Sequence, residues 1–146
     1  MAFHFPLAAV LRYRESIEQR EYFLLEKIQQ EISRLEVRMR EAEEACSKAI
    51  ENRATELAKG ICAADVRSAY EHERALELQI EALHALWQEL KAKWRQQLAS
   101  YEIARRNRET LEKLRERQLN SYTREQAKRE QAVMDDIFLS RRRRGN

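Results

Sequence analysis

The sequence predicts an all-α protein, folded as a long two-helix antiparallel coiled-coil hairpin in which the second helix is the longer one. Composition is the first reason: of 146 residues, 36% are charged, and only two are glycine and one is proline. Such a composition is typical of long helices, because strong helix formers dominate and helix breakers are rare. The other two reasons are a pair of apolar stripes with heptad spacing and a single glycine-containing break between them.

The first helix is predicted over about residues 6–57. Pro6 suits its first turn, where the helix does not need the missing N–H. An apolar stripe follows in alternating steps of four and three residues, which is the a/d pattern of a coiled-coil seam. This stripe comprises Ile28, Ile32, Leu35, Met39, Ala42, Cys46 and Ala49.

A turn is predicted over about residues 58–64, because Gly60 suits a left-handed residue past a helix end and Asp65 suits the cap of the next helix. The second helix is predicted over about residues 65–140, since neither glycine nor proline interrupts it. A basic tail, residues 141–146, is expected to follow. The second apolar stripe comprises Leu76, Ile80, Leu83, Trp87, Leu90, Trp94, Leu98, Tyr101, Leu111, Leu114 and Tyr122.

An antiparallel register centred on the turn matches the two stripes. It places Leu35 opposite Trp87 and Met39 opposite Leu83, so that large side chains face small ones toward the turn. The second helix then runs past the first from about residue 116, within one elongated domain, residues 1–146. An isolated helix is only marginally stable in water, so apolar positions on this extension are expected to need an external partner. These positions are Leu119, Tyr122, Val133, Ile137, Phe138 and Leu139.

Charge and motif content exclude several classes of protein. The net charge of +3 comes from the four arginines near the end, so the body is nearly neutral. No apolar run approaches the roughly 18 residues of a membrane span, and no signal-peptide layout occurs, so a cytoplasmic chain is expected. Cys46 and Cys62 are expected to be reduced thiols. Because metal-binding spacings and a glycine-rich phosphate loop are both missing, no catalytic site, cofactor or metal is predicted.

The residues alone also raise two other function classes. A nucleic-acid binder is suggested by "ARRNRETLEKLRERQ", but Glu109, Glu112 and Glu116 interrupt its arginines. A basic region that enters a DNA groove should be nearly free of acidic residues, so nucleic acid is not the expected partner. A generic structural coiled coil that dimerises stays open.

Motifs along almost the whole chain resemble one family. The segments "FPLAAVLRYRE" near the N-terminus, "LEKLRERQ" from Leu111 and "MDD" at Met134 stand in this order, with Tyr70, Leu76 and Ile80 between them. Their order and spacing resemble the FliJ family of flagellar type III export proteins. The resemblance implies a fold similar to the gamma stalk of the F1 ATPase, no enzymatic activity, and a role in flagellum biogenesis, motility and chemotaxis.

The resemblance also implies partners and a location. The stalk would enter the ring of the hexameric flagellar export ATPase, promote its assembly and activity, link it to the export gate membrane protein, and escort export chaperones. It would be cytoplasmic and peripherally associated with the inner membrane at the flagellar base. A stalk of a virulence type III secretion system stays open as a variant of this interpretation.

Residue by residue, the resemblance implies a ring-binding end made from both ends of the chain. Its residues are Phe5, Leu7, Val10, Leu11, Arg14, Leu114, Arg117, Gln118, Tyr122, Met134, Asp135, Asp136 and Ile137. A gate-binding region is hypothesised where small side chains make the hairpin thin, against the alternative that the alanines only taper the coiled coil. Its residues are Ala42, Ala45, Ala49, His72, Leu76 and Gln79. The "RRRR" tail is open between acidic ring loops, anionic lipid and a solvated end.

Overall fold

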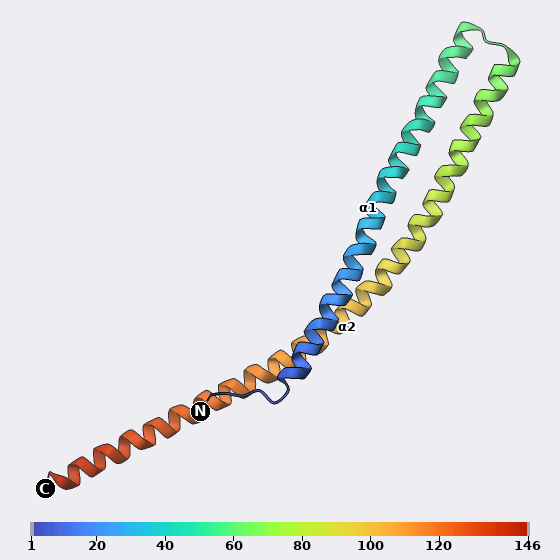
Figure 1. The fold of residues 1–146 in the computed structure, drawn as a ribbon. Coiled ribbons are helices and arrows are strands. Elements are labelled where there is room, and N and C mark those ends of the chain that lie inside the picture. Colours follow the sequence, from blue (N-terminus) through green and yellow to red (C-terminus); the bar gives the residue numbers. More distant parts are fainter. Residues whose placement is uncertain (1, 146) are drawn as a thin grey trace. The chain divides into compact units, whose positions relative to one another are not determined.

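Two long helices make up nearly all of the computed structural model, which describes residues 2–145 (Figure 1). Helix α1 spans Ala8–Lys59 and helix α2 spans Ala63–Arg144. No strand occurs within residues 2–145. The prediction of an all-α hairpin with a longer second helix is therefore confirmed.

The turn between the helices occupies residues 60–62 and is shorter than predicted. Gly60 has a φ of 77°, in the left-handed region that glycine adopts without a steric penalty. Its N–H donates to the carbonyl of Leu57 at 3.2 Å, which closes the end of α1. The N–H of Asp65 donates to the carbonyl of Cys62 at 3.1 Å, so Asp65 lies in the first turn of α2, not at its cap. There its negative carboxylate interacts favourably with the positive end of the helix dipole.

The four arginines predicted to follow the second helix as a tail are helical instead. Helix α2 continues past the predicted boundary near residue 140 and ends at Arg144, and the N–H of Gly145 donates to the carbonyl of Arg141 at 3.1 Å. Arginine is a good helix former, and positive charge stabilises the negative end of the helix dipole. The helix therefore carries its densest positive charge in its last turn.

The chain divides into two compact units. The hairpin unit comprises Glu21–Tyr101, and the terminal unit comprises Met1–Arg20 with Glu102–Asn146. In the hairpin unit, α1 and α2 lie side by side and are joined by the turn (Figure 1). Its core confirms the apolar stripes, because Ile32 has no exposed surface and the partners expected from the register pack in one cluster. The cluster comprises Leu35, Met39, Ala42 and Leu83, with Ile80, Trp87 and Leu90 packed against it.

Candidate partner-binding end

The N-terminal segment folds back onto α2 in the terminal unit. The ring of Phe3 contacts the ring of Tyr122, with 5.6 Å between the centroids and 48° between the planes. Phe5 is only 4% exposed, and Leu11 is buried as well. The expectation that Tyr122 has no partner inside the chain was therefore wrong. The physical reason is the turn at Pro6, which directs the two phenylalanines back along α2.

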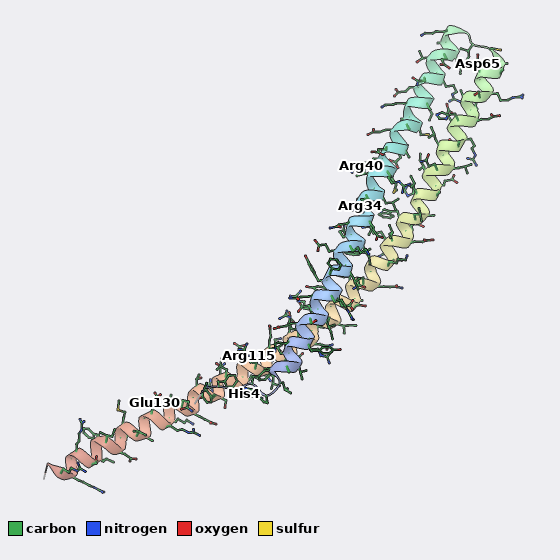
Figure 2. All side chains as sticks on the ribbon, viewed as in Figure 1. His4, Arg34, Arg40, Asp65, Arg115 and Glu130 are labelled. Carbon is green, nitrogen blue, oxygen red and sulfur yellow. The ribbon has the colours of Figure 1, made fainter. Side chains whose placement is uncertain are left out.

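This turn also sets the start of α1. The N–H of Ala8 donates to the carbonyl of Phe5 at 3.2 Å, and regular helical bonding begins with the bond from Leu11 to Leu7 at 2.9 Å. Phe3, Phe5 and Leu11 line a shallow hollow together with Arg115 of α2. Figure 2 shows Arg115 beside the segment that carries His4. The predicted ring-binding residues Phe5 and Leu11 thus form the apolar support of this end of the molecule.

Other predicted ring-binding residues of the terminal unit are open to solvent. Leu7 is 36% exposed, Val10 and Leu114 are also exposed, and so is Arg117. The predicted residues Arg14, Gln118 and Tyr122 are half-buried. The predicted set therefore separates into two layers. Phe5 and Leu11 form a supporting layer, and the exposed and half-buried residues form a solvent-facing layer.

The end of α2 is the most exposed part of the terminal unit. Every described residue from Ala127 to Gly145 is exposed, and Figure 2 shows Glu130 on this stretch. Four of the predicted ring-binding residues lie here, namely Met134, Asp135, Asp136 and Ile137, and Met134 is 69% exposed. An isolated helix gains little stability from its own backbone bonds, so exposed apolar side chains at these positions favour an external partner.

An ionic layer holds α1 against α2 at the base of this end. Arg108 donates to the carboxylates of Glu18 on α1 and Glu112 on α2. The hydrogen bond to Glu18 has the largest effect on the pKa of Arg108 and raises it. Burial, the next largest effect, lowers this pKa, but the net result is a pKa above the ordinary value. Beside it, Arg105 donates to Glu109 at 2.9 Å, and this bond lowers the pKa of Glu109. Of these bonds, the one between Arg108 and Glu18 joins the two helices directly.

The six predicted gate-binding residues do not share one environment. Ala42 lies in the core cluster of the hairpin unit, and Ala49 and Leu76 are half-buried. Ala45, His72 and Gln79 are exposed. A partner at this section can reach the exposed three without any change in helix pairing, whereas Ala42 becomes accessible only if the helices separate.

Within residues 2–145, no group of three or more histidine, cysteine, aspartate or glutamate side chains is placed to hold a metal ion. No helix in the same range is long and apolar enough to cross a membrane.

Comparison with protein families identifies the relationship. The model of the family described as "Flagellar FliJ protein" matches residues 3–146, which is almost the entire chain. The chain belongs to the FliJ family. Its FliJ-like motifs near the N-terminus, at Leu111 and at Met134 all fall inside the matched range. Comparisons with curated proteins and with solved structures gave no significant match.

Membership of the FliJ family settles the coarse function. The chain is a component of flagellar type III protein export, and it is a structural or escort component instead of an enzyme. The motif at Met134 contributes Asp135 and Asp136 to the exposed end of α2, whereas the motif near the N-terminus contributes the buried Phe5. Parts of the family pattern therefore lie on the surface and parts in the support beneath it.

Sequence reasoning missed an ion pair inside the seam of this FliJ-family chain. Arg53 on α1 lies 3.0 Å from the buried carboxylate of Glu73 on α2, and its guanidinium lies 4.2 Å from the centroid of the Tyr70 ring. The two atoms are close but lack the alignment of a hydrogen bond. A signal existed, because Arg53 continues the stripe through Ala49 and Glu73 precedes Leu76 at heptad spacing.

Proposed function

We propose that the chain is the central stalk of the hexameric flagellar export ATPase. In this proposal the terminal unit enters the ring, promotes its assembly and raises its hydrolysis rate. The contact is made by the solvent-facing layer and the exposed end of α2, while the buried Phe5 and Leu11 hold that surface in place. The proposed contact residues are Leu7, Val10, Arg14, Leu114, Arg117, Gln118, Tyr122, Met134, Asp135, Asp136 and Ile137.

The observation that carries the proposal is the contrast within the terminal unit. Its base is braced by Phe5, by the Phe3–Tyr122 contact and by the ionic layer around Arg108. Beyond the base, α2 continues as an exposed helix with Met134 and Ile137 in solvent. A terminal unit whose base is held by packed side chains, and whose end is a single exposed helix, is suited to insertion into a ring. Because one helix cannot contact six similar subunits equally, such a stalk would bias their nucleotide states in turn.

We further propose that the hairpin unit meets the export gate membrane protein and that the chain escorts export chaperones. The exposed residues Ala45, His72 and Gln79 support a gate contact midway along the hairpin. Contact with the gate protein would place the chain peripherally at the inner membrane of the flagellar base. Ala45→Trp tests the contact, because added bulk at an exposed position should block a close partner without reducing helicity. Unchanged gate binding and export in a helical variant would contradict it.

The experiment that tests the stalk uses the cognate export ATPase. Its hydrolysis rate and oligomer size are measured alone, with the full chain, and with a chain truncated after Ala127. The described residues that this truncation removes, 128–145, are all exposed, and the truncated chain keeps Tyr122, the partner of Phe3. We expect stimulation by the full chain and its loss on truncation.

A matched pair of point variants separates contact from general helix loss. Met134→Ser with Ile137→Ser removes two proposed contacts, whereas Thr123→Ser with Ser121→Ala alters exposed positions outside the proposed set. Only the first variant should lose stimulation. If the full chain neither stimulates nor assembles the ATPase while circular dichroism shows intact helices, the stalk proposal fails. Sedimentation at several concentrations then tests the alternative of a dimerising structural coiled coil.

A further inference from the structure

The last three turns of α2 combine exposed apolar side chains with dense positive charge. Val133, Phe138 and Leu139 are more than half exposed, and Phe138 is 67% exposed. Arg141–Arg144 follow after Ser140, and within residues 2–145 no carboxylate forms an ion pair with any of the four. Exposure of the apolar side chains to water is unfavourable, and the positive charges of the arginines have no neighbouring negative charge to neutralise them.

Helical geometry arranges these residues in a definite way. Side chains advance by about 100° per residue in an α-helix, so residues three and four apart share a side. Val133, Met134, Ile137 and Phe138 therefore lie along one side of α2, and Leu139 lies on the other side with Asp135 and Asp136. The four arginines are consecutive, so they surround the end of the helix instead of forming one charged face.

We propose that this end of α2 binds the surface of an anionic phospholipid membrane. The apolar side of the helix would enter the boundary between headgroups and acyl chains, and the arginines would contact lipid phosphates around the helix end. Asp135 and Asp136 would stay on the side facing water. The long arginine stems allow the guanidinium groups to remain at the headgroup level while Phe138 is buried.

Both halves of the cluster favour a membrane over other anionic partners. Nucleic acid neutralises arginines but offers no apolar layer for Ile137 and Phe138. An acidic patch on a folded protein meets one side of a helix, whereas Arg141–Arg144 point in all directions around it. An anionic bilayer supplies charge on every side of an inserted end and an apolar layer beneath it. Apolar contact and a polybasic cluster are the two signals that stable peripheral binding requires.

This inference goes beyond the proposed stalk function and does not depend on it. Membrane association through the gate protein needs a protein partner, whereas the arginine end would bind lipid directly. Val133, Phe138 and the arginines are not among the residues proposed to contact the ring, whereas Met134 and Ile137 belong to both surfaces, so binding of this end to lipid and to the ring would exclude each other. The test uses the protein alone, so its result is independent of ring binding.

Vesicle pelleting with the full-length protein tests the proposal. Binding is measured to phosphatidylcholine vesicles and to phosphatidylcholine vesicles that contain phosphatidylglycerol, at low and at high salt. We expect binding to the anionic vesicles that is at least about tenfold tighter, and weaker binding at high salt because exposed charges are screened. Equal binding to both kinds of vesicle, or no binding to either by a helical protein, would overturn the proposal.

Three variants assign the binding to the end of α2. Replacing Arg141–Arg144 with glutamine should weaken binding at least about tenfold, and Val133→Ser with Phe138→Ser, both on the apolar side, should also release the protein. The matched control replaces four exposed arginines of the hairpin unit with glutamine and removes the same positive charge. Its residues are Arg34, Arg38, Arg40 and Arg95. If the control loses binding as much as the Arg141–Arg144 variant, net charge alone attracts the protein and the assigned site is refuted.

Discussion

Replacing Arg53 with methionine is expected to destabilise the hairpin unit by about 2–3 kcal/mol. Methionine fills similar space but leaves the carboxylate of Glu73 in the seam without its cation. Removing one partner of a fully buried ion pair costs about 3–5 kcal/mol, because the remaining charge has lost both water and partner. The Arg53 and Glu73 side chains are 19% and 9% exposed, so residual hydration reduces this cost. The lost contact between Arg53 and the Tyr70 ring contributes to the same total.

The assay is urea unfolding followed by circular dichroism and by tryptophan fluorescence. Both tryptophans, Trp87 and Trp94, lie in the hairpin unit and report on its unfolding directly. The double variant Arg53→Met with Glu73→Leu should recover most of the lost stability, since no charge then remains in the seam. The control is Arg74→Met, which removes the exposed Arg74–Glu77 pair and should cost less than about 1 kcal/mol.

Two results would refute the reasoning about this ion pair. The first is an Arg53→Met variant no less stable than the Arg74→Met control. The second is a double variant whose loss equals the two single losses added together, because independent sites add and coupled ones do not. Either would mean that the seam tolerates the carboxylate of Glu73 without Arg53.

Three further predictions concern single positions. Ile32→Ala should cost about 2–5 kcal/mol in urea unfolding, because Ile32 is completely buried, and a cost below about 1 kcal/mol would mean that the seam collapses around the cavity. Gly60→Ala should cost about 1–2 kcal/mol because of the left-handed φ, whereas Gly145→Ala should be nearly neutral in the same assay. The folded-state pKa of Glu109 lies below its ordinary value of 4.5, chiefly through its bond to Arg105, so its contribution to stability is present above that pH and is lost as pH falls through the lowered pKa. The stability difference between wild type and Glu109→Gln should therefore narrow in acid, and a constant difference would contradict the assignment.

The fold was predictable because its main determinants are periodic. The stripe from Ile28 to Ala49 and the facing stripe around Leu83 specify one seam, and Gly60 supplies the break between them. Periodicity does not report on a short nonhelical segment, so it gave no indication that Phe3 packs on Tyr122. Apolar periodicity alone does not reveal the ion pair between Arg53 and Glu73, because both residues are charged.

The burial of Phe5 leads to a prediction that separates support from contact at the terminal unit. Phe5→Ala removes a ring that is 4% exposed and should cost at most about 3–5 kcal/mol, since the N-terminal segment can detach and avoid a cavity. Leu7→Ser alters a side chain that is 36% exposed and should leave stability within about 0.5 kcal/mol.

If the stalk proposal is right, both variants weaken stimulation of the ATPase, but for different physical reasons. Lowering the temperature should restore stimulation by the Phe5→Ala variant, because its N-terminal segment docks again. It should not restore stimulation by the Leu7→Ser variant, because that variant lacks the leucine side chain that would contact the ring. Stimulation is measured across a temperature series, with circular dichroism as the record of folding. A Phe5→Ala variant that remains fully folded yet never stimulates would show that Phe5 leaves its buried position to contact the ring, and the division between support and contact would be wrong.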